Sequence, residues 1–326
     1  MTVRQIGVGV GVGVGVGVGL FLVASSLGYG SSGRNGARAS GHVYWVTQTD
    51  GGKVWSVPIG GGRVTLLARD QKGPRAVAVD GTHVYWVSTG GGTINKIPLA
   101  GGSVTIVASG QKVPASLAVD GTHVYWGGGV DWTVRKAALG GGRVTTLASG
   151  QLDPDSVAVD GTHVYWANDY YDGAVKKVPL GGGKAITLAS SQAGPLSLAV
   201  DGTHVYWVNM QAGTVNKVPL GGGKVTTLAR GQNSPISLAV DGTHVYWANY
   251  GGGTVKKVRL GGGKVTTLAR GQNSPISLAV DGTHVYWVNY GDEDHPNGSV
   301  KEVPLGGGRV TTLARSKHPV SVALGH

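Results

Sequence analysis

The chain has 326 residues, enough for one large β domain or two ordinary domains; 60 of them are glycine and only 14% are charged. It contains no cysteine, which excludes disulfide bonds and thiolate metal sites. The formal charge of +11 fits lysines and arginines that recur at fixed repeat positions on a solvated rim. Alternatively, the positive charge attracts a polyanion such as nucleic acid or an acidic envelope polymer. Because the sequence has no nucleic-acid-binding motif, we expect no specific nucleic-acid ligand.

The N-terminal segment differs in kind from the rest of the chain. Arg4 precedes an uncharged run over residues 6–26 that is rich in Gly and Val and ends in small residues. This pattern predicts a secretory signal peptide over residues 1–26, and a retained membrane anchor is the alternative. Residues 27–40 are predicted to be a flexible linker. The chain is therefore expected to be secreted, periplasmic or part of the cell envelope, with membrane association through this segment if it is retained.

One short motif returns through the rest of the sequence at nearly constant spacing. The heptapeptide "DGTHVYW" begins at Asp80, Asp120, Asp160, Asp201, Asp241 and Asp281, and a clipped "GHVYW" occupies residues 41–45. The histidines of successive copies are 40 or 41 residues apart. That period is typical of a β-propeller blade and too long for an ankyrin or leucine-rich repeat.

Each copy reads as four short strands. In the copy that starts at Pro235, apolar or alternating runs occupy residues 236–240, 243–249, 254–260 and 264–269. Asp241-Gly242 predicts a two-residue type I′ hairpin, in which both residues have positive φ. The three glycines at 261–263 predict the next tight turn. No segment has a helical period, so the predicted blade is a four-stranded meander.

Alternation along the second strand predicts how the blades pack. His244 and Tyr246 point to one face, and Val245 and Trp247 point to the other. Because both faces carry bulky rings, both must be covered by neighbouring blades, with the tryptophan in the layer between blades. The small Ser and Ala residues of the first strand are expected near the crowded axis because of their size.

The two ends of the repeat array predict how the ring closes. The first copy lacks a first strand, while residues 319–324 at the C-terminus match the first-strand pattern "PISLAV". The C-terminal strand should therefore complete the first blade, which removes exposed sheet edges. We predict an all-β fold, a seven-bladed propeller of four-stranded antiparallel blades over residues 41–326.

The repeated residues resemble a known class of propeller. The order of Pro, "LAVD", "VYW", a Gly-flanked "TVKKV" and a Gly turn resembles the YWTD repeats of low-density-lipoprotein-receptor-type propellers, and more loosely NHL repeats. The general layout is also similar to bacterial streptogramin-lyase-type propellers. The resemblance implies an extracytoplasmic binding propeller. It departs from the YWTD pattern where Val-Asn or Ala-Asn follows "YW", and those relatives usually have six blades and disulfide-bonded flanking modules.

The loops that break the repeat gather at one end of the ring. In a meander, loops between the second and third strands and loops between blades share one end, here named the variable face; the other end carries only the uniform "DG" and "GGG" turns. Binding residues usually lie on such loops. The candidates are Trp132 and the loop residues Asp169, Tyr170, Tyr171, Asp172, Tyr290, Asp292 and His295. Aromatic rings there can stack on sugars or bases, and Asp292, Glu293 and Asp294 are weak candidates for a Ca²⁺ site, which a solvated acidic loop would also explain.

A second set of candidates surrounds the central channel. The residue after each first-strand proline should line its mouth, and at these positions Arg75 and Asp155 interrupt five apolar residues. They are expected either to orient a polar ligand or to satisfy nearby loops. No nucleophile–base–orienter set accompanies them. The seven repeated histidines are expected to have structural roles, because equivalent atoms on stacked sheets lie about 10 Å apart, too far to share one metal ion.

Three functions follow from this pattern. The first is a monomeric binding scaffold that recognises a protein, peptide or glycan through the variable face, without a cofactor. The alternative is a lyase-like or lactonase-like enzyme with its site at the channel mouth. A structural module without a ligand is the third. Residues 220–247 recur letter for letter at 260–287, which leaves few unique side chains for catalysis and favours the scaffold.

Overall fold

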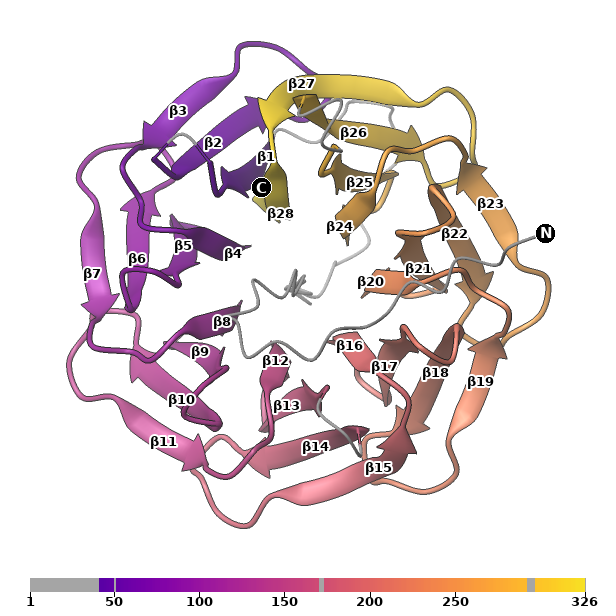
Figure 1. The fold of residues 1–326 in the computed structure, drawn as a ribbon, viewed down its shortest axis with the longest axis horizontal. Coiled ribbons are helices and arrows are strands. Elements are labelled where there is room, and N and C mark those ends of the chain that lie inside the picture. Colours follow the sequence, from indigo (N-terminus) through magenta and orange to yellow (C-terminus); the bar gives the residue numbers. More distant parts are fainter. Residues whose placement is uncertain (1–40, 50, 170–172, 292–296, 326) are drawn as a thin grey trace, which may run out of the picture.

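The computed structural model describes residues 41–49, 51–169, 173–291 and 297–325. In these residues the chain forms seven four-stranded antiparallel sheets arranged as blades around a central axis (Figure 1). The predicted seven-bladed β-propeller is therefore confirmed. The predicted signal or anchor segment and the linker lie outside the described residues. Within the described part, no helix is long and apolar enough to span a membrane.

Every blade runs from an innermost strand at the axis to an outermost strand at the rim, which has four residues in five blades and seven in β15 and β27. Blade one is β28-β1-β2-β3, and blades two to seven follow in chain order from β4 to β27. The innermost strands are β28 (Pro319–Gly325), β4 (Pro74–Val79), β8 (Pro114–Val119), β12 (Pro154–Val159), β16 (Pro195–Val200), β20 (Pro235–Val240) and β24 (Pro275–Val280). The second strands are β1 (His42–Thr47), β5 (His83–Ser88), β9 (His123–Gly128), β13 (His163–Asn168), β17 (His204–Asn209), β21 (His244–Asn249) and β25 (His284–Asn289). The third strands are β2 (Lys53–Pro58), β6 (Thr93–Pro98), β10 (Thr133–Ala138), β14 (Gly173–Pro179), β18 (Thr214–Pro219), β22 (Thr254–Arg259) and β26 (Asn297–Pro304). The rim strands are β3 (Thr65–Ala68), β7 (Thr105–Ala108), β11 (Thr145–Ala148), β15 (Ile186–Gln192), β19 (Thr226–Ala229), β23 (Thr266–Ala269) and β27 (Thr311–Lys317).

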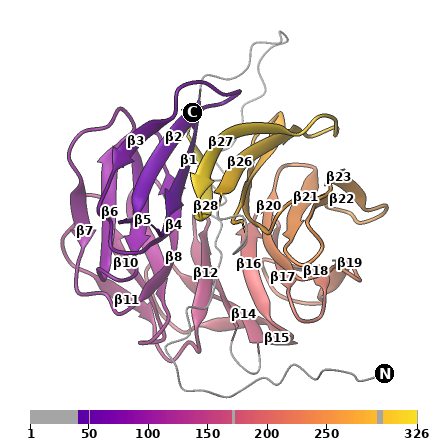
Figure 2. The ribbon, with the colours of Figure 1, turned by 45° about the horizontal axis from the view of Figure 1, so that its top comes forward.

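The C-terminal strand closes the ring, as predicted. β28 pairs antiparallel with β1, with Trp45 opposite Val322 and Tyr44 opposite Ala323. Figure 2 shows the yellow C-terminal strand beside the indigo strands of blade one. Because the two ends of the repeat array share one sheet, β1 has a paired inner edge, like the second strand of every other blade.

The tryptophan of each repeat fills the layer between blades. Trp45, Trp86, Trp126, Trp166, Trp207, Trp247 and Trp287 are all at most 1% exposed. The predicted packing is confirmed. It fixes how neighbouring blades stack, since such large rings leave no room for alternative registers.

The "DG" turn has a different cause from the one predicted. Neither Asp241 nor Gly242 has positive φ, so the type I′ prediction is wrong. Instead, Asp241 Oδ1 accepts hydrogen bonds from the Thr243 and His244 amides and the Thr243 hydroxyl, and Oδ2 accepts one from Tyr246. The aspartate side chain therefore makes the turn. The "GGG" turn follows the prediction, with φ of +87° at Gly262 and +114° at Gly263.

Polar contacts also join one blade to the next. The Leu198 amide donates to Ser156 Oγ across two innermost strands at 3.1 Å, and the same bond joins Leu238 to Ser197. The sequence analysis explained these serines by their small size alone. That explanation is incomplete, because their hydroxyl oxygens also accept hydrogen bonds from buried backbone amides. Farther out, Lys217 Nζ donates to the Leu260 carbonyl of the following blade at 2.7 Å. Part of the positive charge thus ties blades together, in addition to the solvated rim.

Candidate functional site

The channel mouth on the variable face holds an ion pair between blades that are not neighbours. Arg75 follows the first-strand proline of β4, and Asp155 follows that of β12; Arg75 Nη2 lies 3.6 Å from Asp155 Oδ1. Blade three lies between them, and its equivalent residue is the small Ala115. The guanidinium therefore reaches across the intervening strand. The sequence prediction that these two positions line the mouth together is consistent with this geometry.

Two further carboxylates lie beside this ion pair. Asp153 precedes the proline of β12, and Asp169 follows β13, where its amide contacts the Asp153 carbonyl at 3.4 Å. Burial raises the pKa of Asp155 to about 7, Arg75 partly offsets this, and Asp153 and Asp169 raise it further. Burial and the Asp153 charge raise the pKa of Asp169 to about 6. The mouth is therefore an acidic cluster of Asp153, Asp155 and Asp169 with one guanidinium, and burial raises the pKa of all three carboxyls.

Strained backbone positions these side chains. Asp153 has φ +58° and Val113, at the equivalent position of the preceding blade, has φ +51°. Positive φ is uncommon for any residue with a side chain and unfavourable for a β-branched one. Glycine or serine stands at this place before the proline in blades two, five, six and seven, namely Gly73, Gly194, Ser234 and Ser274. In blade one His318 holds this place, with φ +42°, and its ring packs against Tyr290. Val113 and Asp153 are thus the other two large residues at this position in the described ring, and Val113 is exposed.

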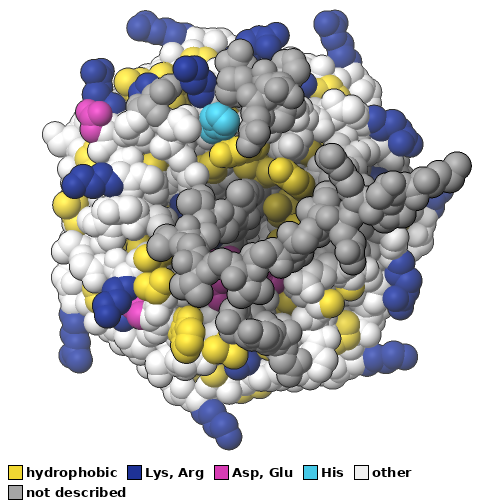
Figure 3. Space-filling model, viewed as in Figure 1, with side chains coloured by type: hydrophobic (Ala, Val, Ile, Leu, Met, Phe, Trp, Pro, Cys, Tyr) yellow, Lys and Arg dark blue, Asp and Glu magenta, His cyan; other side chains and the backbone are white. Residues whose placement is uncertain are grey.

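Apolar side chains are exposed next to the acidic cluster. Val130 is 60% exposed, Trp132 46%, Leu152 38% and Val113 37%. The Gly129 amide donates to the Val113 carbonyl and the Gln151 amide to the Trp132 carbonyl, so backbone hydrogen bonds hold these loops together. We name Val113, Val130, Trp132 and Leu152 the apolar patch. On the face shown in Figure 3, apolar and acidic side chains lie together near the centre, with Lys and Arg around the rim.

The remaining predicted residues, and Asp131 beside the predicted Trp132, have different positions. Asp131, beside Trp132, is bonded to Arg135 at 2.7 Å and to Thr133 at 2.9 Å, so it stabilises its own loop. Tyr290 packs edge-on against His318, with ring centroids 4.8 Å apart, which limits its use as an open stacking surface. The remaining candidates lie outside the described residues: Tyr170, Tyr171, Asp172, Asp292, Glu293, Asp294 and His295.

The predicted calcium site is therefore not tested at its own residues. Among the residues that the structure describes, no group of three His, Asp or Glu side chains is placed to hold a metal ion. The repeated histidines bond to their own turns, as His244 Nδ1 does to Thr243 Oγ1 at 2.7 Å. A Ca²⁺ ion at 292–294 stays a prediction.

Sequence reasoning missed four residues of this site. Asp153, Val113, Val130 and Leu152 were not among the predicted candidates. A signal was present for two of them, because Val113 and Asp153 replace the Gly or Ser that precedes the first-strand proline in four of the other five blades; the fifth has His318. The clustering itself depends on loops from three consecutive blades, which a comparison of single repeats does not show.

Comparison with known proteins supports the fold. A search with protein-family models found no match, and neither did a search of curated proteins. A chain of a solved nidogen/laminin complex superposes with a TM-score of 0.62 at 16% identity, over 88% of this chain and 98% of that one. A streptogramin B lyase gives 0.67 at 11% identity, over 78% and 87%. A computationally designed protein, Ika8, gives 0.64 at 18% identity, over 93% of each chain. The chain thus has the β-propeller fold of these proteins, and its repeats resemble the YWTD and NHL type.

Proposed function

We propose that the protein is a binding scaffold that captures a segment of a partner protein on the variable face, at the apolar patch and the acidic cluster beside it. The observation that carries this proposal is the exposure of Trp132 and its apolar neighbours next to carboxylates, on loops held by a rigid ring. Exposed apolar groups bordered by charge mark interaction sites, and tryptophan is enriched among residues that dominate binding energy.

The chemistry of the site suggests which segment it would take. An apolar side chain of the partner would pack on Trp132 and Leu152, and a neighbouring Lys or Arg would meet Asp153 and Asp169. The carboxylates outnumber the one guanidinium, Arg75, so a basic residue is favoured over an acidic one. The similarity to a chain of a nidogen/laminin complex supports a role in protein–protein contact only by analogy of fold. We also propose that the site works outside the cytoplasm, as the N-terminal sequence suggests.

A defined peptide library tests the proposal. Peptides selected on the wild-type protein should carry Lys or Arg within a few positions of an aromatic or aliphatic residue. Their affinity should fall at least tenfold in Trp132→Ala and in Asp169→Asn. Tyr250→Ala is the matched control, because Tyr250 is an exposed aromatic residue in the corresponding loop of blade six. Peptides without basic residues, or equal binding by the wild type and both site variants, would contradict the proposal.

Catalysis at the channel mouth is the second candidate function. The observation that favours it is the raised pKa of Asp155 and Asp169, about 7 and about 6, since a general acid or base works best near the operating pH. A lyase-like or lactonase-like enzyme would open a cyclic ester supplied in the assay. Turnover that vanishes in Asp155→Asn while the variant melts like the wild type would support catalysis. Absence of turnover across macrocyclic and small lactones would argue against it.

A further inference from the structure

The junction between the last and first blades differs in sequence from the other six. Elsewhere a glutamine stands in the loop that enters each innermost strand, at Gln71, Gln111, Gln151, Gln192, Gln232 and Gln272. The last copy reads "LARSKHP" where the preceding one reads "LARGQNSP", so it is one residue shorter and has no glutamine. We call this place the seam.

The glutamine side chain accepts hydrogen bonds from the following blade at several of these junctions. Gln232 Oε1 accepts from Trp247 Nε1 at 3.1 Å and from Lys256 Nζ at 3.2 Å. Gln111 Oε1 accepts in the same way from Arg135 at 2.9 Å. Gln71 and Gln192 accept from Trp86 and Trp207 in the same way, so the glutamine satisfies the indole N–H of the buried tryptophan at three of these junctions.

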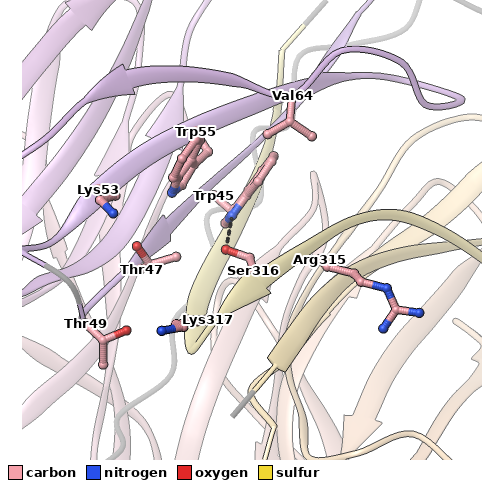
Figure 4. A pocket seen from close by; sticks show the side chains of 9 residues that line it. All are labelled: Trp45, Thr47, Thr49, Lys53, Trp55, Val64, Arg315, Ser316 and Lys317. Carbon is pink, nitrogen blue, oxygen red and sulfur yellow. Dashed lines mark hydrogen bonds between the residues drawn. The ribbon is translucent and has the colours of Figure 1, made fainter. Parts of the chain in front are cut away.

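At the seam, two residues differ from those at the equivalent positions of other blades, and a cavity lies beside them. Ser316 replaces the glutamine as acceptor for Trp45 Nε1, at 3.0 Å, but its side chain is shorter. Trp55 stands opposite Trp45 in the register, where Lys256 stands opposite Trp247. The two indoles stack with centroids 6.3 Å apart and planes at 13°. They border a pocket of about 270 Å³, which Figure 4 shows between β1, β2 and β27.

Two buried polar atoms at the pocket have no hydrogen-bond partner. Among the described residues, Trp55 Nε1 and Thr49 Oγ1 are buried without a hydrogen-bond partner, and both residues line the pocket. Buried donors and acceptors are almost always paired in folded proteins. At the junction of blades three and four, Trp166 Nε1 is also unpaired, but Gln151 Oε1 there is an unpaired acceptor that can complete it. The seam has no such glutamine, so a bound molecule would supply the acceptor.

The charged residues that the structure describes along the pocket are positive. Lys53, Arg315 and Lys317 line it together with Thr and Ser hydroxyls, and none of its lining residues in the described part of the chain is Asp or Glu. Lys53 Nζ lies 5.9 Å from the centre of the Trp55 ring. An aromatic face, an indole donor, a hydroxyl and several cations together suit a polar ring that carries an anionic group.

We propose that the seam pocket binds a uronic acid residue of an acidic polysaccharide. The pyranose ring packs on the face of Trp55, since Trp45 is only 1% exposed, and a ring hydroxyl accepts from Trp55 Nε1 and bonds to Thr49 Oγ1. The carboxylate is held by the positive side chains, Lys53 foremost. The net charge of +11 favours the approach of a polyanion. This site is separate from the apolar patch, which lies on blades three and four.

Titration with tri-galacturonate, followed by calorimetry and by the indole N–H signals of labelled tryptophan, tests the proposal. We expect binding that shifts the Trp55 signal, and neutral maltotriose should bind at least tenfold more weakly. Trp55→Asn should lower affinity at least tenfold; asparagine occupies this position in blades two and five, as Asn95 and Asn216, so the variant should fold. Lys53→Met, which removes the positive charge and keeps a flexible apolar side chain, should also weaken binding.

Two controls separate this site from its surroundings. Lys264→Met removes an exposed cation on another blade, and Trp132→Ala removes the tryptophan of the apolar patch; both should bind tri-galacturonate like the wild type. Loss of peptide capture in Trp132→Ala with the sugar still bound would show two independent sites. No binding of tri-galacturonate, equal binding of maltotriose, or full affinity in Trp55→Asn or Lys53→Met would overturn the proposal.

Discussion

At the scale of single residues, the aspartate of each "DG" turn joins the turn to the packed blade. Asp120 accepts hydrogen bonds from the Thr122 and His123 amides and from the Tyr125 hydroxyl, all at 2.7–2.8 Å. Burial alone would raise the pKa of Asp120, but the bonds from Tyr125, His123 and Thr122 outweigh burial and hold the pKa below its ordinary value. The charged carboxylate is therefore the form that stabilises the fold.

Replacing this aspartate should destabilise the protein. We expect Asp120→Ala to lower the free energy of unfolding by about 2–3 kcal/mol at pH 7, since bonds to a charged group are lost. Because the folded pKa is lowered, the stabilisation is present above the unfolded value of 3.8 and is lost as the pH falls through the folded pKa. Urea denaturation at pH 7 and pH 3 measures both effects. Gly121→Ala is the control, because nothing lies within 4 Å of its added Cβ and its φ is not positive; an equal loss in that variant would contradict the account.

The carboxyls at the channel mouth have the opposite dependence on pH. The folded pKa of Asp169 is raised to about 6 by burial and by Asp153, so its ionisation weakens the fold as the pH rises from about 4 through 6. Asp169→Asn should therefore be about 1–2 kcal/mol more stable than the wild type at pH 8, after allowance for solvent screening, and nearly equal to it at pH 4. Denaturation at the two pH values decides, and a difference that does not change with pH would refute this reading.

At the scale of the elements, lysines on the third strands hold adjacent blades together. Lys217 donates to the Leu260 carbonyl and Lys177 to the Leu220 carbonyl, each in the "GGG" turn region of the next blade. Lys217→Met should cost about 1–3 kcal/mol, because the carbonyl loses a charged donor. Lys224→Met, at an exposed position of the same blade, should change stability by less than about 0.5 kcal/mol. Equal melting temperatures for the two variants would show that the hydrogen bond between Lys217 and the Leu260 carbonyl contributes nothing to stability.

The strand order and length of each blade were predictable, because the alternation of side chains and the spacing of the repeats depend on them directly. Alternation placed Val245 and Trp247 on one face, and the spacing of the histidines fixed the blade length. Details that depend on side chains from another part of the chain were not predictable. The "DG" pair suggested positive φ, whereas the turn is made by the carboxylate; the bond from Leu198 to Ser156 needs two blades in contact before it exists.

The candidate site was predictable only in part, for the same reason. Arg75 and Asp155 were found because each breaks a repeat position near the axis. Asp153 became relevant only when the structure placed it beside Asp169, at the other end of the β12–β13 hairpin, and the seam pocket required the two ends of the repeat array to meet. The position of a residue within its repeat can be predicted from the local sequence pattern. A site formed between blades can be found only once the closed ring is known.

At the scale of the whole molecule, closure by β28 should be essential. A chain that ends at residue 318 leaves β1 without its inner partner and exposes a sheet edge, so we expect loss of cooperative unfolding and aggregation. A circular permutant that joins residue 324 to His42 through Asp-Gly-Thr recreates the ordinary repeat and should melt cooperatively near the wild-type temperature. Scanning calorimetry compares the three proteins. A truncated chain that unfolds like the wild type would contradict the need for closure.

The central claim is that a uniform ring presents its function where the repeat is broken, at the loops of blades three and four. Hydrogen exchange followed along the chain, with and without a peptide selected on the wild-type protein, tests it most directly. The account predicts that the peptide slows exchange in residues 111–115, 128–133 and 150–155 and leaves the "DG" and "GGG" turns unchanged. Slowed exchange at those uniform turns, with no change in the three loop segments, would contradict it.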